Sequence, residues 1–570
     1  MKPGEGRTGP RAVGRADGAW ATILAAFSAQ ENWPEPDRLP RDAYNDGMTT
    51  LYDLIVVGAG MGGLALAALA QRQGLQVALL EAHTRLGGCA GWFDRGPYTF
   101  DVGATALMGL GPGEPIGRLV ADLSLEVEAV TSPVYRVHLP DRRVDIVGEA
   151  DRFEANQAAA FPGRETARRR FWRIQAAVGE TLFRAVSGGP RFPVRSPGVL
   201  VHDLRLLGGS GLAAAATSLL TVDDVLGLLG LASDRPFRTF VAMLLQDTAQ
   251  AGPETVPFAN AAACLQAYRR GLARPRGGMR AWVEGLGRRF VELGGELRRA
   301  TLVDRVEPAN TGNGTGAVWA VTTRRRESWL ARHVAFNLPI DLAAALLGRR
   351  LEGRLGRMER RSRAVWSAVT GYVVMPRDAV DDETPLFHQV LQDAAAPIHD
   401  GNNVLVSLSP PGDLGFGPES VRVATMSTHV RPADWSDLTP EAHAQRKQVY
   451  RDRLLAALER AIPGAEARLL HAEFGTPRSF RRYTRRSAGA VGGPPVSRWN
   501  SNVRAVGCDE LGPGLWLVGD SVFPGQGTMA VVVSAQRVVE RIIAEQSRTG
   551  RSKTPAKRTE PARCPVGEGG

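Results

Sequence analysis

The order of apolar and polar positions is most regular between residues 52 and 104. Four consecutive apolar residues follow Asp53, which predicts a buried strand at residues 53–57. A cluster of glycines comes next, and the apolar run at 64–69 then predicts a helix. A second buried strand is predicted at 75–80. This order of elements predicts one β–α–β unit with two parallel strands.

The turn of this unit carries glycines at the spacing of a dinucleotide site. Gly58 permits a tight turn, Gly60 lets the backbone approach a pyrophosphate, and Gly63 lets the helix pack against the sheet. The helix N-terminus can then face the phosphates. Glu81 ends the second strand about 20 residues later, where an acid can bind a ribose diol and disfavours the 2′-phosphate of NADP. Chance glycine matches are common in a chain with 65 glycines, but strand, turn, helix and acid all agree here.

Further glycine-containing segments lie after Glu81 and near the C-terminus. Residues 85–91 read Arg-Leu-Gly-Gly-Cys-Ala-Gly, and residues 98–104 read Tyr-Thr-Phe-Asp-Val-Gly-Ala. A strand predicted at 515–518 ends in Gly-Asp, followed by Ser-Val-Phe-Pro-Gly-Gln-Gly and an apolar helix from Thr528 onward. Because a helix N-terminus favours an anion, this last segment suits the negative charge of a reduced flavin.

Together these motifs resemble the FAD-dependent carotenoid desaturases and carotenoid isomerases, the phytoene desaturase-like branch of the amine oxidase-type flavoproteins. The resemblance runs from Met48 to about Ala544. It implies an α/β fold, in which a Rossmann-like FAD-binding domain is interleaved with a substrate domain of mixed sheet and helices. It also implies that Asp520 binds the ribityl or pyrophosphate region, and that Val306 gives backbone hydrogen bonds to adenine.

The residues expected to bind FAD are spread over distant stretches of the chain. They are Gly58, Gly60, Gly63, Glu81, Arg85, Gly87, Gly88, Gly103, Val306, Gly519, Asp520, Gly527, Thr528 and Met529. The residues expected nearest the flavin ring are Phe523, Pro524, Gly525 and Gln526, together with residues 102–104.

No residue is assigned a catalytic role, because no triad, carboxylate pair or metal-binding cluster stands out. His388 and His429 are candidate bases, but a structural hydrogen bond explains each of them more simply. No metal is expected.

The resemblance and the predicted elements also divide the chain into segments. Residues 1–47 are interpreted as a disordered extension or a mis-called start, and 547–570 as a disordered basic tail. The FAD-binding domain is expected at 48–145, 271–345 and 486–546. The substrate domain is expected as a helical lid region at 146–270 and as sheet and helices at 346–485.

The segment at 197–245 is strongly apolar, with polar breaks such as Asp223-Asp224. It can be a helical core, or a lid that faces lipid or lines a tunnel for a long hydrocarbon. The resemblance favours the second interpretation, because a polyene must be extracted from the bilayer. Since the chain has no run of 18 apolar residues, we expect a cytoplasmic protein in peripheral contact with the inner face of the membrane.

The formal net charge of +11 invites a nucleic-acid interpretation, but other features oppose it. The arginines are scattered, and aromatic residues are only 6% of the chain, too few for a stacking platform. We therefore expect no nucleic-acid partner. The cysteines (Cys89, Cys264, Cys508 and Cys564) show no metal or disulfide spacing and are predicted to be reduced thiols.

The lack of a strong base fits a polyene substrate. Loss of a hydride to the flavin leaves a cation spread along the conjugated chain, so the remaining proton is acidic. We predict an FAD-dependent desaturase of an acyclic carotene, with the C-3′,4′ bond as a candidate. The alternatives are a carotenoid cis–trans isomerase that uses reduced FAD, and a non-catalytic protein that binds flavin or carotenoid. The oligomeric state is not indicated.

Overall fold

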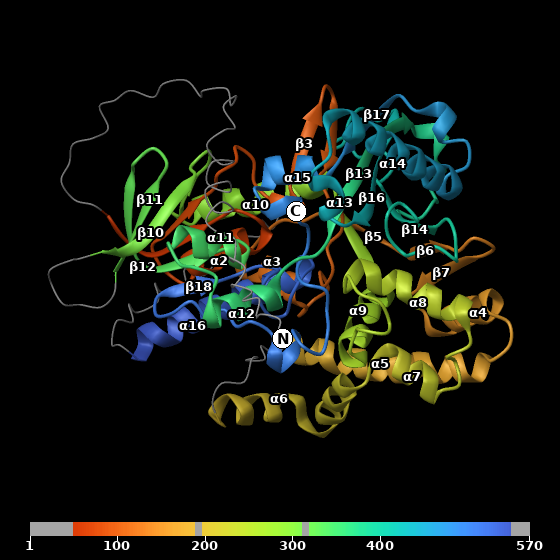
Figure 1. The fold of residues 1–570 in the computed structure, drawn as a ribbon, viewed down its shortest axis with the longest axis horizontal. Coiled ribbons are helices and arrows are strands. Elements are labelled where there is room, and N and C mark those ends of the chain that lie inside the picture. The colour runs from red at the N-terminus through yellow and green to blue at the C-terminus, as the bar shows by residue number, and fades with distance from the viewer. Residues whose placement is uncertain (1–49, 188–196, 310–317, 549–570) are drawn as a thin grey trace, which may run out of the picture. The chain divides into compact units, whose positions relative to one another are not determined.

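Residues 50–187, 197–309 and 318–548 are described by a computed structural model. The predictions made for residues 1–47 and for most of the C-terminal tail lie outside these residues. Figure 1 shows two sheets in the described chain, each with its own covering helices.

The first sheet is the Rossmann-like sheet expected from the sequence. Its central strand β1 (Leu51–Val57) pairs in parallel with β2 (Val77–Leu80) and with β12 (Ser328–Phe336). The strand order is β10–β11–β12–β1–β2–β9, and β18 also pairs with β12. The other strands are β9 (Glu296–Arg298), β10 (Val303–Ala309), β11 (Val318–Thr323) and β18 (Leu515–Leu517). Residues 54–56 are fully buried, which explains their unbroken apolar run.

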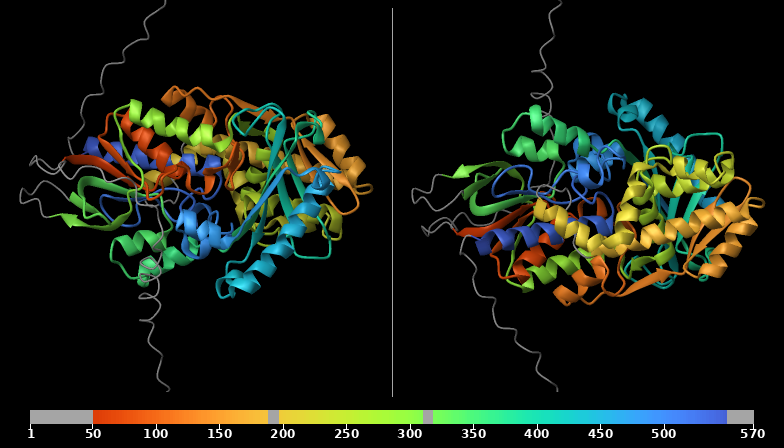
Figure 2. Two further views of the ribbon diagram at one scale, coloured as in Figure 1. Left: turned by 90° about the horizontal axis from the view of Figure 1, so that it is seen from above. Right: turned by 90° about the horizontal axis from the view of Figure 1, so that it is seen from below.

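Helices cover both faces of this sheet. Leu54 and Val56 point to one face, where they share a buried cluster with α2 (Met61–Arg72), α3 (Pro115–Leu123), α10 (Gly278–Glu292) and α16 (Thr528–Arg548). Ile55 and Val57 point to the other face, towards α11 (Ile340–Leu346) and α12 (Gly353–Ser362). Figure 2 shows these two helical layers on opposite sides of the strands.

The second sheet is mostly antiparallel and forms the core of the remaining chain. Its order is β17–β13–β16–β15–β14–β6–β7, with a parallel pairing between β14 and β6. The strands are β6 (Val134–His138), β7 (Arg143–Val147), β13 (Ser367–Pro376), β14 (Phe387–Leu391), β15 (Asn403–Leu408), β16 (Val421–Val430) and β17 (His471–Gly475). Strands β13, β16 and β15 are neighbours in this sheet, within the segment 346–485 where sheet and helices are expected.

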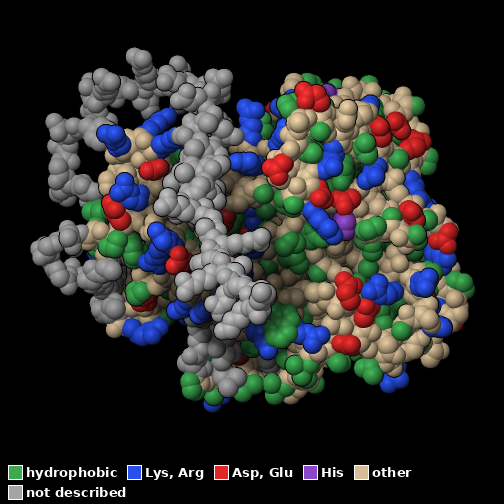
Figure 3. Space-filling model, viewed as in Figure 1, with side chains coloured by type: hydrophobic (Ala, Val, Ile, Leu, Met, Phe, Trp, Pro, Cys, Tyr) green, Lys and Arg blue, Asp and Glu red, His purple; other side chains and the backbone are tan. Residues whose placement is uncertain are grey.

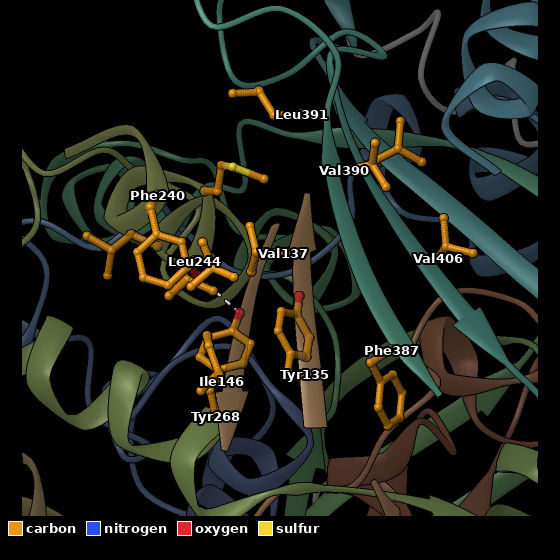
Figure 4. Close-up of a cluster of buried hydrophobic side chains, with 14 of the residues drawn as sticks. Tyr135, Val137, Ile146, Phe240, Leu244, Tyr268, Phe387, Val390, Leu391 and Val406 are labelled. Carbon is orange, nitrogen blue, oxygen red and sulfur yellow. Dashed lines mark hydrogen bonds between the residues drawn. The ribbon is translucent and has the colours of Figure 1, made fainter. Parts of the chain in front are cut away.

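The helices of this second region pack on the sheet through one large apolar cluster. In Figure 4, Phe240 and Leu244 of α8 lie against Val137 of β6 and Ile146 of β7. Burial of each large apolar side chain contributes about 1.5–3 kcal/mol. The helices are α4 (Ala150–Ala160), α5 (Glu165–Ser187), α6 (Pro197–Ala216), α7 (Val222–Leu228), α8 (Arg235–Thr248), α9 (Phe258–Arg270), α13 (Ala433–Ser436), α14 (Pro440–Ala461) and α15 (Pro477–Thr484).

Two small antiparallel sheets complete the described chain. The first is a hairpin of β3 (Trp92–Arg95) and β4 (Tyr98–Asp101), and the second pairs the distant strands β5 (Ala129–Ser132) and β8 (Leu272–Pro275). A fully buried ion pair between Asp101 and Arg274, 2.9 Å apart, ties the two small sheets together. The predicted segment limit at residue 145 falls inside β7, and β6 and β7 both lie in the second sheet.

Candidate FAD and substrate site

The glycine turn after β1 has no room for larger residues. A Cβ on Gly63 would lie 2.1 Å from the carbonyl oxygen of Gly58, so α2 contacts the turn backbone directly. Gly58 has φ +98°, a conformation that favours glycine. No side chain of the described residues caps α2 at Gly60, so its first N–H groups are available to a ligand such as a phosphate.

The second glycine pair, Gly87 and Gly88, lies against this turn. The Gly87 N–H donates to the Ala59 carbonyl oxygen at 2.9 Å. A Cβ on Gly88 would be 3.4 Å from the Cα of Gly60. The two glycine motifs, separate in sequence, therefore form one backbone surface.

Glu81 lies at the edge of the same surface. Its carboxylate accepts the Ala59 N–H at 2.6 Å and the His83 N–H at 2.7 Å. Burial raises the pKa of Glu81, while these two N–H groups and the positive charge of Arg485 act in the opposite direction. Each carboxylate oxygen has a further lone pair that can accept a hydrogen bond from a ribose hydroxyl. The assignment of Glu81 to the ribose stays a prediction.

The C-terminal Gly-Asp motif meets the first turn through Asn337, which follows β12. The Asn337 side chain donates to the Gly58 carbonyl oxygen at 3.2 Å. A Cβ on Gly519 would lie 2.8 Å from the Asn337 amide oxygen, and one on Gly62 would lie 3.3 Å from the Cα of Gly519. The two predicted anchors are thus adjacent, although more than 400 residues of sequence separate them. Asn337 is not among the residues expected to bind FAD, because no sequence motif points to it.

Asp520 is held by a buried arginine. Arg486 donates to its carboxylate at 2.6 Å and to the Gly492 carbonyl oxygen at 2.7 Å. The Arg486 Nε has no partner among the described residues and is shielded from solvent. A buried donor without a partner is unfavourable, so this N–H suits an anionic ligand that the glycine surface would also bind.

The loop that precedes α16 lies between the two regions of the chain. Gly525 and Gly527 have φ +121° and +105°, and a Cβ on either would meet no atom within 4 Å. Gln526 donates to the Thr248 carbonyl oxygen at 2.9 Å and accepts the Gly493 N–H at 3.2 Å. One side of the loop is therefore bonded to α8, and the other side borders open space. A large planar ring could lie in that open space.

The other residues expected near the ring and the helix start have mainly packing contacts. Arg537 lies over the ring of Phe523, and Pro524 follows a cis peptide bond. Thr528 donates to the Ala106 carbonyl oxygen at 3.2 Å. The Met529 side chain lies beside Gly109. The structure therefore places Thr528 and Met529 next to residues 106–109, which follow the predicted 102–104 segment in sequence.

Three expected FAD residues have surroundings that bear on their roles. The Arg85 guanidinium lies 4.4 Å from the centre of the Trp92 ring and 3.4 Å from Asp94, so it is bound to β3. A Cβ on Gly103 would be 3.1 Å from the Cys89 carbonyl oxygen. Val306 has a buried side chain in β10, and only its backbone could face a ligand. The chain just before β10 bonds to the Glu81 carbonyl oxygen, so this strand starts beside the predicted ribose site.

Burial favours the neutral forms of Cys89, His388 and His429. Burial raises the pKa of the Cys89 thiol, which opposes a reactive thiolate. Burial lowers the pKa of His429 to about 4 and that of His388 to about 3. His388 bonds to His138 at 3.1 Å and to the Pro385 carbonyl oxygen at 2.8 Å, in the structural role expected for it. No group of His, Cys, Asp and Glu that could hold a metal is found in the described ranges.

Known proteins are similar to the chain over most of its length. Residues 56–123 match the NAD(P)-binding Rossmann-like domain. The chain is 24% identical to the chloroplastic prolycopene isomerase of Daucus carota, covering 88% of this chain and 81% of the relative. It is 26% identical to a lycopene-forming phytoene desaturase of Paracoccus sp., covering 86% of this chain and 97% of the relative. These are its homologues. The predicted resemblance to carotenoid desaturases and isomerases is thereby confirmed.

The chain has the same fold as amine oxidases of known structure. A putrescine oxidase bound to putrescine superposes with a TM-score of 0.58 at 18% identity, covering 87% of this chain and all of the oxidase. A cyclohexylamine oxidase from Brevibacterium oxydans gives a TM-score of 0.57 at 15% identity, covering 88% and 100%. The glycine surface, the adjacent Gly-Asp anchor and the fold agree, and the chain binds FAD.

Proposed function

We propose that the chain is an FAD-dependent enzyme that modifies the conjugated double bonds of a carotenoid. The observation that carries the proposal is the closure of two distant anchors on one site, in a chain whose homologues act on such polyenes. In this proposal Gly58, Gly60 and Gly63 approach the pyrophosphate, and Asp520 holds the ribityl or pyrophosphate region. Bound FAD would supply hydride transfer at an allylic carbon.

The described residues between the two sheets suit an apolar substrate. The Tyr372 hydroxyl of β13 donates to the Val102 carbonyl oxygen at 2.7 Å, and the Ser407 hydroxyl of β15 lies 2.9 Å from that of Thr105. The second sheet therefore fixes the segment expected beside the flavin ring. Gln250 lies next to Gln526 in the loop that precedes α16, and its amide oxygen is buried without a partner among the described residues. None of these groups is charged, and a buried charge would be unfavourable beside a hydrocarbon.

Two reactions are candidates. Desaturation of an acyclic carotene is the reaction predicted from the sequence. Cis–trans isomerisation is favoured by the similarity to prolycopene isomerases, which covers as much of the chain as the similarity to phytoene desaturases. No described residue singles out one carbon–carbon bond, so the C-3′,4′ position stays a prediction.

The redox balance separates the two reactions. Anaerobic enzyme with oxidised FAD is mixed with an acyclic carotene or with a cis-carotene, and the flavin spectrum and the product mass are followed. Desaturation predicts a loss of two mass units from the carotene and one FAD reduced per new double bond. Isomerisation predicts unchanged mass, changed geometry, and turnover only with pre-reduced FAD. An enzyme that binds FAD but changes no carotene under either condition would contradict the proposed function.

We also propose that the enzyme contacts the membrane peripherally. No helix among the described residues is both long and apolar enough to cross a bilayer. Leu219, Trp499 and Val503 are 79%, 67% and 58% exposed, and a hydrogen bond of 3.4 Å between Asn502 and Ser218 joins the two segments that carry them. Exposed leucines of α6 continue this apolar surface along the lower edge of Figures 1 and 3. Arg498 and Arg504 flank it, which suits anionic lipid headgroups.

Vesicle binding tests this surface. The double variant Leu219→Ser/Trp499→Ala is expected to bind vesicles of anionic phospholipid at least tenfold more weakly. The two substitutions remove about 1.4 kcal/mol or more of the free energy gained when apolar side chains are buried in the lipid. Leu414→Ser is the matched control, because Leu414 is 73% exposed but lies in the loop between β15 and β16. Equal vesicle binding by the wild type and both variants would contradict the proposed membrane surface.

A further inference from the structure

The segment after α15 places two consecutive arginines beside both FAD anchors. The α15 helix packs against residues 88–90, and the ring of Tyr483 lies 6.1 Å from that of His83. Arg485 and Arg486 follow directly. The chain that carries them therefore runs from the Glu81 side of the site to the Asp520 side.

Arg486 bonds to one anchor, and the charge of Arg485 acts on the acid of the other. The positive charge of Arg485 acts on Glu81 and lowers the pKa of that carboxyl, against the larger effect of burial. Among the described residues, no hydrogen bond or ion pair is found for its guanidinium. Arg486 donates to Asp520 at 2.6 Å and to the Gly492 carbonyl oxygen at 2.7 Å. The two arginines are thus associated with the two acids of the site.

The charges of the site show why cations are needed there. The diphosphate of FAD carries two negative charges, and Glu81 and Asp520 are acids at the two anchors. The glycine turn offers N–H groups and a helix N-terminus, which together act as only a partial positive charge. Arg85 is bound to Trp92 and Asp94, and so is not free to supply the rest.

We propose that Arg485 and Arg486 form a two-arginine clamp on the diphosphate of FAD. This inference depends on FAD binding but not on the reaction at the flavin ring. Arg486 would donate its unpartnered Nε–H, and Arg485 its free guanidinium, to phosphate oxygens from the side opposite the glycine turn. Arg486 also holds the Asp520 carboxylate in place through its other donors.

Titration of the apoprotein with FAD, followed by flavin fluorescence, tests the clamp. A lost hydrogen bond to a charged group costs about ten- to a hundredfold in affinity, so we expect Arg486→Gln to raise the FAD Kd by this factor. Because its guanidinium is more exposed, we expect Arg485→Gln to raise the Kd about three- to tenfold. ADP, which keeps the diphosphate but lacks the flavin ring, should lose affinity in parallel. Arg482 is an exposed arginine of the preceding helix α15, so Arg482→Gln is the control and should stay within twofold.

Because Arg486 is buried beside Asp520, its loss could also unfold the site. The Arg486→Lys variant keeps the charge, and the Arg486→Gln/Asp520→Asn variant removes both charges of the pair. If the clamp is correct, the double variant melts like the wild-type apoprotein but still binds ADP at least tenfold more weakly. Unchanged FAD and ADP affinity in all folded variants would overturn the clamp. Wild-type protein that binds neither ligand would instead overturn the FAD assignment itself.

Discussion

The two regions of the molecule make their sites in different ways. Around the FAD anchors the backbone itself forms the surface, and a single added methyl group would overlap neighbouring atoms at Gly60, Gly63 and Gly519. In the region of the second sheet, which is proposed to bind the substrate and is called the substrate region below, sheet and helices pack through large apolar side chains. The loop at Gly525 and Gly527 borders free space. Cofactor binding should therefore tolerate almost no change, whereas the substrate region should tolerate conservative apolar substitutions.

The largest effect is expected at Gly63. Its Cβ would lie 2.1 Å from the Gly58 carbonyl oxygen, so Gly63→Ala must displace either the turn or α2. We expect FAD affinity to fall at least a hundredfold and the free energy of unfolding to fall by about 1–3 kcal/mol. FAD titration and thermal unfolding check this.

The control is Gly227→Ala on α7, where a Cβ meets no atom within 4 Å. Alanine should stabilise that helix by up to about 1 kcal/mol and leave FAD affinity unchanged. If both variants changed FAD affinity and the free energy of unfolding by similar amounts, the proposed difference between the two regions would be wrong.

A smaller effect is expected at Asn337, which joins the two anchors. Asn337→Ala removes the hydrogen bond to the Gly58 carbonyl oxygen but creates no overlap. A net loss of about 1–1.5 kcal/mol corresponds to an FAD affinity about tenfold lower. If the affinity of this variant equals that of the wild type, the anchors do not depend on Asn337.

The substrate region should show its own pH dependence through buried histidines. The folded-state pKa of His388 is lowered to about 3, chiefly by burial, whereas the unfolded chain binds the proton near its ordinary pKa of about 6.5. Its contribution to stability is therefore complete above pH 6.5 and is lost as the pH falls towards 3. We expect a loss of about 2 kcal/mol from this group by pH 5. Chemical unfolding at several pH values should give His388→Gln a shallower decline than the wild type, and parallel curves would contradict the assignment.

The smallest effect is expected at Arg85, one of the residues proposed from the resemblance. Its guanidinium is stacked on Trp92 and paired with Asp94, and the side chain is 34% exposed. Arg85→Gln should change FAD affinity by less than about threefold, since exposed ion pairs contribute about 1 kcal/mol or less. A tenfold loss would show that Arg85 leaves Trp92 to bind the cofactor.

The sequence predicts those parts of the site that depend on local backbone geometry. Gly58, Gly60, Gly63 and the Gly519-Asp520 pair can be found from spacing, because a tight turn between a strand and a helix requires glycine in a fixed order. The packed strands are predictable for the same reason, since alternation of apolar residues is a local signal.

Other residues depend on contacts between distant segments, and their sequence signal is weak. Asn337 contacts Gly58 from 279 residues away, and Arg486 meets Asp520 only after α15 has packed on the FAD region. One asparagine after a strand, or two arginines in a chain rich in arginine, is not distinctive by itself. The pairing of β6 with β14 is likewise nonlocal, which is why a limit predicted at residue 145 falls within a strand.

The central claim is that one FAD is held where the N-terminal glycine turn meets the C-terminal Gly-Asp pair. Titration of the apoprotein with FAD, for the wild type, Gly63→Ala and Asp520→Ala, tests it most directly. We expect saturable binding of one FAD per wild-type chain and a loss of at least tenfold in affinity when either anchor is changed. A wild-type protein that stays colourless after reconstitution, or binding that survives both substitutions unchanged, would contradict it.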